Sequence, residues 1–274
     1  MKSAVVFGLR LYTVLVFLFI LAPIAASFVV SLNVDRFPTL PLGGFSLKWY
    51  DAVGNDTAVA GAITNTLLVG VVVGVVVSLV STFIGFATAY TDFRYQFFGK
   101  SVYLALALLP PTIPTVIMGL AMLVYLSTVN LWGGVHSAII AHVVLCTPFA
   151  MALIRLRLSQ MDPDMESAAW NLGATQWRAM WSVILPFAVP GIVSALLLTM
   201  AVSFDEFIIA WFITGFNETL PVKILNTLQG RVSPKINAMG SMVFSVTIML
   251  VIISQAVLFA RGKKARGVQD ASGA

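Results

Sequence analysis

Long uncharged runs constrain the fold of this chain more than any other feature of its sequence. From Thr57 to Thr91 there is no Asp, Glu, Lys or Arg, and across the whole chain 10% of residues are charged while 59% are hydrophobic. A soluble domain carries roughly 25% charged residues. Because a helix of about 20 apolar residues crosses the roughly 30 Å hydrocarbon core of a bilayer, the composition predicts an integral membrane protein.

Six such runs are long enough to span a membrane as helices. We predict spans at about 11–34, 62–91, 102–129, 133–154, 187–206 and 238–260, within a single transmembrane domain that covers residues 1–274. A membrane β-barrel would need strands in which apolar and polar residues alternate. The runs lack that alternation, so the predicted fold class is all-α.

The loops between the spans differ in positive charge, and this difference predicts the orientation. With the N-terminus inside, eleven of the 16 Lys and Arg residues fall in cytoplasmic segments, and both termini are therefore predicted to be cytoplasmic. The same asymmetry explains the net charge of +5, so no nucleic-acid partner is expected. The first apolar run is longer than the core of a secretory signal, roughly 7 to 15 residues, and we expect it to remain as an uncleaved span.

Small and cyclic residues mark special positions inside the spans. Gly70 and Gly74 lie on one helix face and predict close packing of a neighbouring helix. The stretch from Pro110 to Pro114 holds three prolines, which remove backbone donors and predict a kink in the third span. This kink could be a structural bend or part of a translocation path. His136 and His142 are not spaced to share one helix face, so we expect no metal site.

Residues 155–186, between the fourth and fifth spans, are the longest predicted cytoplasmic segment. Asp162 precedes an acidic first turn and is expected to cap a helix, which Gly173 should end in a left-handed conformation. A second helix is predicted from Gln176 to Val183, ending ahead of Pro186. The aromatic and aliphatic side chains of this segment suit either the lipid interface or a groove on a partner protein.

The segment resembles the cytoplasmic EAA loop of ABC importer membrane subunits, whose pattern is Glu-Ala-Ala, three residues, Gly, nine residues, Ile, any residue, Leu-Pro. Ala168 and Ala169 stand at the required distance before Gly173, and Leu185 and Pro186 close the pattern. Two positions differ, because Ser167 replaces the motif Glu and Val183 replaces the Ile. Glu166, one residue earlier, is the candidate to supply the missing charge.

The resemblance implies a type I ABC importer permease fold in the bacterial inner membrane. It implies that a coupling helix inserts into an ATPase subunit, with Trp170 and Leu172 as its apolar face. The residues implied for this contact are Glu166, Ala168, Ala169, Leu172, Gly173, Leu185 and Pro186. The implied partners are an ABC ATPase dimer that binds ATP and Mg, a second and different homologous permease, and an extracytoplasmic solute-binding protein. No catalytic residue and no cofactor are expected in this chain.

A second resemblance concerns the solute. The stretch Ser203-Phe204-Asp205-Glu206-Phe207, a later Thr-Leu-Pro and a Ser-Pro-Lys-Ile-Asn-Ala stretch are similar to membrane subunits of spermidine/putrescine-type importers. This implies transport of a polyamine. Related importers for ferric iron or phosphonates share much of the scaffold and remain alternatives, and a secondary transporter or channel is the alternative from a different class.

The residues themselves also favour a cationic solute. Ionisable side chains near membrane depth are costly and usually face a bundle interior or a water path. Asp205 and Glu206 could attract ammonium groups there, and Asp205 is the stronger candidate. The rings of Phe204, Phe207 and Trp211 offer cation–π contacts and complete the predicted substrate path. The opposing interpretation places both acids at the outer interface, where they are solvated or paired with Lys223 or Arg231.

Overall fold

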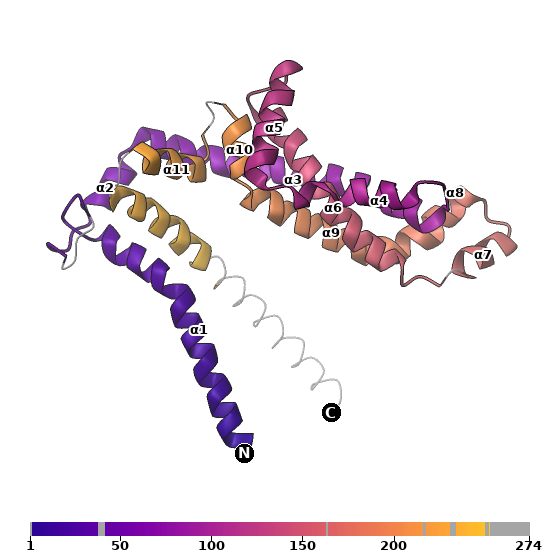
Figure 1. Ribbon diagram of the computed structural model, residues 1–274, viewed down its shortest axis with the longest axis horizontal. Coiled ribbons are helices and arrows are strands. Elements are labelled where there is room, and N and C mark those ends of the chain that lie inside the picture. Colours follow the sequence, from indigo (N-terminus) through magenta and orange to yellow (C-terminus); the bar gives the residue numbers. More distant parts are fainter. Residues whose placement is uncertain are drawn as a thin grey trace, which may run out of the picture. The chain divides into compact units, whose positions relative to one another are not determined.

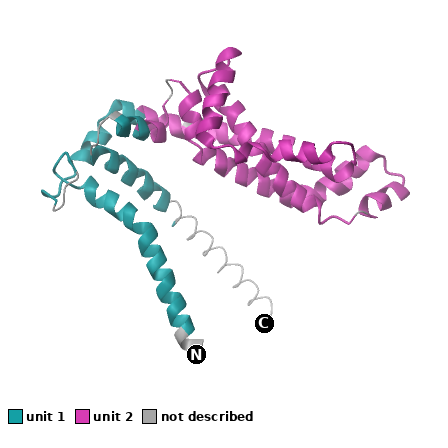
Figure 2. Cartoon of the chain, in the orientation of Figure 1, with its two compact units in different colours: residues 1–60, 224–274 teal, residues 61–223 magenta. Residues whose placement is uncertain are grey.

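The computed structural model describes residues 2–37, 42–162, 164–215, 218–230, 234–249 and 252. Within these ranges the regular elements are helices, apart from one isolated bridge between Asn33 and Phe45. The predicted all-α class is confirmed. Figure 2 shows two compact units: unit 1 comprises residues 1–60 and 224–274, and unit 2 comprises residues 61–223.

Unit 1 is built from helices at both ends of the chain. It contains α1 (Lys2–Ser31), α2 (Lys48–Gly54), the start of α3 (Thr57–Arg94), the end of α11 (Leu220–Gly230) and a helix at 234–249. The Oγ of Ser27 donates to Asn237 Oδ1 at 3.2 Å, and the rings of Phe28 and Phe244 meet edge to face at 6.0 Å. These contacts join α1 to the helix at 234–249.

One ion pair ties the same helix to the start of α3. Lys235 Nζ donates to Asp56 Oδ2 at 2.5 Å, and this hydrogen bond lowers the pKa of the Asp56 carboxyl below its usual range. No residue of α1 from Val5 to Val30 is buried within the structure, and Phe19 is 82% exposed. Such a surface suits lipid or another membrane protein.

Unit 2 holds most of the packed helices. Its elements after α3 are α4 (Lys100–Leu108), a 3₁₀ turn (Pro110–Thr112), α5 (Thr115–Thr128), α6 (Val135–Leu158), α7 (Asp164–Asn171), α8 (Gln176–Ala179), a π-helical turn (Met180–Ile184), α9 (Leu185–Asp205) and α10 (Ile208–Ile213). In Figure 1, α3, α6 and α9 run side by side, with α5 and α10 toward one end and α7 and α8 at the other.

Four described helices are long and apolar enough to cross a membrane: Val5–Ser31, Thr57–Arg94, Val135–Leu158 and Gln176–Asp205. The predicted third span, 102–129, is divided between α4 and α5, each too short to cross alone. The predicted sixth span, 238–260, is helical as far as residue 249, and its remainder lies outside the described residues except for residue 252.

The proline-rich stretch breaks the third span completely. The helix α4 ends at Leu108, and Pro110 and Pro111, which have no N–H group to donate, form a 3₁₀ turn. The chain is extended at Ile113 and Pro114 before α5 begins at Thr115. The predicted kink is therefore a break between two helices.

The predicted end of the second cytoplasmic helix ahead of Pro186 is wrong. The chain stays helical from Gln176 to Asp205, passing through the π-helical turn at Met180–Ile184. Pro186 cannot donate to the carbonyl of Ser182, and its ring would press on that carbonyl in a regular α-helix. The wider π turn directly before it lets the helix continue, so that Pro186 lies in the first turn of α9.

Glycines set the spacing of the long helices in unit 2. A Cβ atom at Gly85 on α3 would lie 2.7 Å from both the Cβ of Ala150 and the backbone nitrogen of Met151 on α6. At Gly70 a Cβ would lie 2.9 Å from the Phe204 ring on α9. Helices in lipid associate through close packing rather than through the hydrophobic effect, so these contacts are a main source of cohesion. The close packing predicted at Gly70 is confirmed.

We predict that Gly85→Ala destabilises unit 2, because the new methyl group must push the backbone of α6 away. Overpacking of this kind costs about 1–3 kcal/mol, more than the up to about 1 kcal/mol that Ala gains over Gly in a helix. Thermal unfolding of the detergent-purified chain should shift to lower temperature. The matched control is Gly61→Ala on the same helix, where nothing lies within 4 Å of the added atom. Equal unfolding temperatures for the two variants would contradict the prediction.

Candidate functional site: the α7 segment and a small cavity

The helix α7 has defined ends. Asp162 Oδ1 accepts from the backbone N–H of Asp164 at 2.9 Å and so caps the first turn. At the other end Gly173 adopts φ +83°, its N–H donates to Trp170 O at 2.8 Å, and the Ala174 N–H donates to Ala169 O at 3.0 Å. This pair of bonds is the Schellman arrangement, which satisfies the last carbonyls of a helix. The capping predicted for Asp162 and Gly173 is confirmed.

One arginine binds the inner face of α7 to the end of α3. The Nε of Arg94, the last residue of α3, lies 3.2 Å from Glu166 Oε1, and Glu166 is only 7% exposed. The guanidinium of Arg94 also lies 4.8 Å from the centre of the Trp170 ring. Glu166 and Trp170 are four residues apart and share a helix face. Arginine suits both contacts, because its planar group can pair with a carboxylate and stack on a ring.

The exposed side of α7 carries an apolar stripe between polar side chains. Met165, Ala168 and Leu172 recur at spacings of three and four residues, and Leu172 is 89% exposed. We call these three residues the outer stripe. Trp170 is half-buried against Arg94, so Trp170 and Leu172 do not form one exposed face as expected. Glu166 likewise points into the chain, where its charge pairs with Arg94 at the end of α3.

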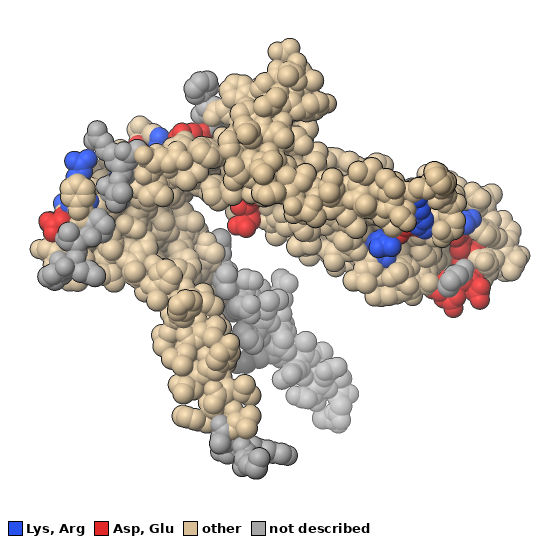
Figure 3. All heavy atoms as spheres, viewed as in Figure 1, with Lys and Arg blue, Asp and Glu red and all other residues tan. Residues whose placement is uncertain are grey.

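The segment after Gly173 continues this exposed surface. Thr175 Oγ1 accepts from the Arg178 N–H at 3.3 Å and caps α8. The rings of Trp177 and Trp181 meet edge to face at 5.9 Å, and both side chains are exposed. On the face shown in Figure 3, charged side chains of unit 2 gather at the end that holds α7 and α8, beyond a broad uncharged surface. Of the other predicted contact residues, Ala169 and Leu185 are half-buried and Pro186 is exposed.

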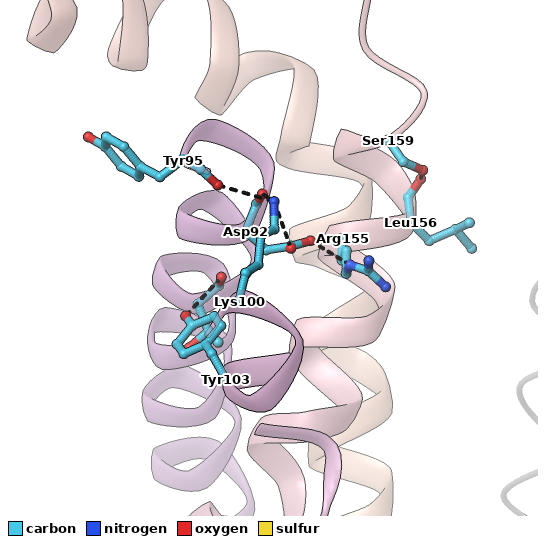
Figure 4. Close-up of polar contacts among 8 residues, drawn as sticks. Asp92, Tyr95, Lys100, Tyr103, Arg155, Leu156 and Ser159 are labelled. Atoms are coloured by element: carbon cyan, nitrogen blue, oxygen red, sulfur yellow. Dashed lines mark hydrogen bonds and ion pairs between the residues drawn. The ribbon is translucent and has the colours of Figure 1, made fainter. Parts of the chain in front are cut away.

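A buried carboxylate organises the same end of the bundle. Asp92, near the end of α3, is 6% exposed; its Oδ1 lies 3.2 Å from Lys100 Nζ and its Oδ2 lies 2.6 Å from Arg155 Nε (Figure 4). Lys100 Nζ also donates to the carbonyls of Asp92 at 2.5 Å and Tyr95 at 3.1 Å. These bonds join α3, α4 and α6. In the sequence, Arg94, Lys100 and Arg155 indicated only the orientation of the chain, and their partners were not predicted.

A signal for this cluster was present in the sequence. Asp92 directly follows the uncharged run that ends at Thr91, and a carboxylate buried at such a place needs a cation beside it. The pairing itself depends on which helices meet, and the sequence does not specify that.

A small cavity lies at the opposite end of α9, within unit 2. It measures about 50 Å³ and is lined from α3 by Thr66, Gly70 and Val73, from α6 by Ala138 and His142, from α9 by Ser203 and Phe204, and by Glu206, Phe207, Ala210, Thr214, Thr219 and Pro221. The His142 Nδ1 and Ser203 Oγ atoms lie 3.0 Å apart and share a hydrogen bond. This volume holds a few water molecules at most, so a larger solute requires the helices to separate.

The predicted path residues divide at the end of α9. Phe204, Glu206 and Phe207 line the cavity, whereas Asp205 is exposed and Trp211 lies beside Phe212, with ring centres 5.0 Å apart. The helix ends at Asp205, so the two neighbouring acids diverge.

The acids at this end have different partners. Glu206 Oε1 accepts from the backbone N–H groups of Ile208 at 2.8 Å and Ile209 at 3.0 Å, which starts α10. Lys223, the suggested partner of the two path acids, pairs with Glu218 at 3.2 Å. Arg231, the other suggested partner, lies outside the described residues.

We predict that Arg94→Gln loosens α7 locally. Loss of an ion pair to a largely buried carboxylate and of a cation–π contact removes about 1–2 kcal/mol, which corresponds to roughly tenfold faster amide exchange. Hydrogen exchange should rise in residues 164–171 and stay unchanged in α6. Arg178→Gln, which removes an exposed cation from the next helix, is the control. Equal exchange of α7 in both variants would show that Arg94 does not hold it.

Comparison with known proteins gives consistent matches. Residues 81–264 match the family model described as "Binding-protein-dependent transport system inner membrane component". The chain is 30% identical to the spermidine/putrescine transport system permease protein PotC of Haemophilus influenzae, over 88% of this chain and 93% of that one. It is 28% identical to the putrescine transport system permease protein PotI of Escherichia coli K12, over 91% and 90%.

A solved structure supports the fold. A chain of a bacterial alginate ABC transporter, in complex with a pentasaccharide-bound periplasmic protein, superposes with a TM-score of 0.67 at 17% identity, covering 93% of each chain. At this identity the likeness concerns the fold alone, which is that of an ABC transporter subunit.

Proposed function

Since the chain belongs to the family of binding-protein-dependent transport system inner membrane components, we propose that it forms part of the path by which an ATP-driven importer moves a polyamine inward. As a family member it is a membrane-embedded transport subunit, and ATP hydrolysis is the task of a separate ATPase. The single observation that carries the proposal is the construction of α7, which is capped at both ends, bound on its inner face, and exposes the outer stripe.

The outer stripe is the surface that α7 offers to the ATPase. A short amphipathic helix that places its apolar side in a groove is a recurring mode of protein recognition. Leu172 is the most exposed member, and Gly173 directly after it ends the helix so that the contact has a fixed length. Because its side chain is only a methyl group, Ala168 keeps the middle of the outer stripe narrow. We assign Ala169, Leu185 and Pro186 to the helices that carry the stripe, since Ala169 and Leu185 are half-buried and Pro186 lies in the first turn of α9.

Two helices connect this contact with the cavity. The helix Gln176–Asp205 has 30 residues, which is about 45 Å at 1.5 Å per residue, and its far end carries Ser203 and Phe204 of the cavity wall. The helix α3 runs from Arg94 to Thr66 and Gly70, which line the same cavity. Closely packed helices shift as rigid bodies, so a displacement of α7 by the ATPase moves both walls of the cavity.

The cavity lining supports a cationic solute. Glu206 brings a carboxylate, and Phe204 and Phe207 bring aromatic rings that can face an ammonium group. Both curated relatives have names that include putrescine. In the structure the cavity is too small for such a solute, so transport requires a second arrangement in which the helices separate. Differential binding of ATP and of the delivering protein by the two arrangements would shift their populations.

The remaining subunits complete the machine. We assign a second, homologous but different permease to the other side of the path, an ATPase dimer with ATP and Mg to the α7 side, and an extracytoplasmic solute-binding protein to the opposite side. The solved complex of an alginate transporter with its periplasmic protein is an assembly of that kind.

Leu172→Asp should weaken association with the ATPase, because it places a charge in the apolar groove without disturbing the chain itself. Truncating a well-buried anchor of an interface costs about 2 kcal/mol or more, so co-purification of the ATPase should fall by at least about tenfold. Asn171→Asp adds the same charge on a neighbouring exposed residue and should retain the ATPase. Full co-purification with Leu172→Asp would remove the outer stripe as the docking surface.

Glu206→Gln should lower putrescine or spermidine uptake by about tenfold, because Gln still accepts the two capping hydrogen bonds but no longer carries a charge. Uptake is measured with the labelled polyamine in cells that produce the complete transporter. Asp205→Asn removes the adjacent, exposed charge, and its uptake is measured in parallel to test the other acid of the pair. If neither variant lowers uptake, the attraction of a cation by these acids is excluded, and a solute such as a phosphonate becomes the better assignment.

A further inference from the structure

We propose that the cavity between α3, α4 and α6, beside Arg155, binds an anionic phospholipid of the cytoplasmic leaflet. The cavity has a volume of about 410 Å³ and is separate from the one that Glu206 lines. Its apolar wall is made by Phe93, Leu108, Ala152 and Leu156. Its charged edge is formed by Arg155, which pairs with Asp92 (Figure 4). The placement at the cytoplasmic surface rests on the proposed function, which puts the ATPase at the α7 end.

The charges of the cluster leave one positive charge for a ligand. Asp92 carries one negative charge, and Lys100 and Arg155 carry one positive charge each. The ammonium group of Lys100 pairs with the Asp92 carboxylate and donates to the backbone carbonyls of Asp92 and Tyr95. The Arg155 side chain is 47% exposed and uses its Nε on Asp92, and within the described residues no hydrogen bond from its other four N–H groups occurs. A phosphodiester with one negative charge complements this group.

The surroundings of Arg155 favour a lipid over a soluble phosphate. A free anion needs only donors, whereas this cavity presents a mostly apolar wall next to a single guanidinium. Ser159 adds no donor, since its hydroxyl donates to Leu156 O at 2.9 Å. A phospholipid occupies both the charged edge and the apolar wall of the cavity. Its phosphate lies on Arg155, and its glycerol and first acyl carbons lie on Phe93, Leu108 and Leu156. Basic pockets between transmembrane helices on the cytoplasmic side are typical places for anionic head groups.

A lipid at this place would stabilise the ends of the three helices that Asp92 joins. Asp92 is two residues before Arg94, so the lipid and α7 act on the same turn of α3. The lipid therefore supports the part of α3 that receives the displacement of α7.

The test uses the complete importer complex, purified in detergent, and native mass spectrometry with added lipid. Phosphatidylglycerol should bind more tightly than phosphatidylcholine, and Arg155→Gln should weaken phosphatidylglycerol binding about tenfold, as loss of a charge-assisted hydrogen bond predicts. Arg178→Gln removes an exposed cation elsewhere at the same end and should bind as the wild type does.

A second variant guards against a folding defect at Arg155. Ala152→Trp fills the cavity from its exposed wall and leaves the Asp92 pairs intact, so it should also lower phosphatidylglycerol binding. Equal binding of both lipids, or wild-type binding by Arg155→Gln and Ala152→Trp, overturns the proposal. So does displacement of the lipid by glycerol 3-phosphate at equal concentration, which would identify a site for free phosphate. Polyamine uptake and co-purification of the ATPase are measured in separate experiments. Failure of the proposed function can therefore be distinguished from failure of the lipid proposal.

Discussion

The position of α7 depends on one guanidinium. Arg94 pairs with Glu166, which is largely buried, and lies over the ring of Trp170. A buried carboxylate is tolerated only when it is paired, and removing one partner leaves an uncompensated charge. The same contact fixes which face of the helix points outward, so that Leu172 and the rest of the outer stripe are available to a partner. The motif position occupied by Ser167 carries no charge, and the acid one residue earlier serves a contact within the chain.

The contact between Arg94 and α7 is attached to a set of tightly packed helices in unit 2. Bare glycine surfaces let α3 approach α6 and α9 closely, and Asp92 ties α3, α4 and α6 together next to Arg94. The π-helical turn lets the helix that begins at Gln176 pass Pro186 without interruption. In the proposed mechanism, two continuous helices carry a displacement at one end to the cavity at the other end. Soft loops would absorb such a displacement, and tightly packed helices do not.

Local features of this structure could be predicted from the sequence, and contacts between distant segments could not. The apolar runs predicted which parts of the chain form the long helices, although α1 and the helix that ends at Asp205 begin earlier than predicted and the third run is divided between α4 and α5. The caps at Asp162 and Gly173 followed from residue type. Glu166 and Arg94 were both visible, but their pairing requires knowledge that the end of α3 meets α7. Asp205 and Glu206 were assigned to one path, and their divergence depends on where α9 ends. The π turn was missed because proline usually ends a helix, and residue type did not indicate the wider turn that keeps this helix continuous.

The coupling role of the Arg94 contact is tested most directly by the ratio of polyamine transported to ATP hydrolysed by the complete importer in proteoliposomes. Replacing Arg94 by Gln should leave the ATPase bound and hydrolysing while transport per ATP falls several-fold. Exchange of the two charges in the double variant Arg94→Glu with Glu166→Arg should restore part of that ratio. An unchanged ratio in Arg94→Gln would contradict the mechanism, because α7 would then transmit its displacement without being held to α3.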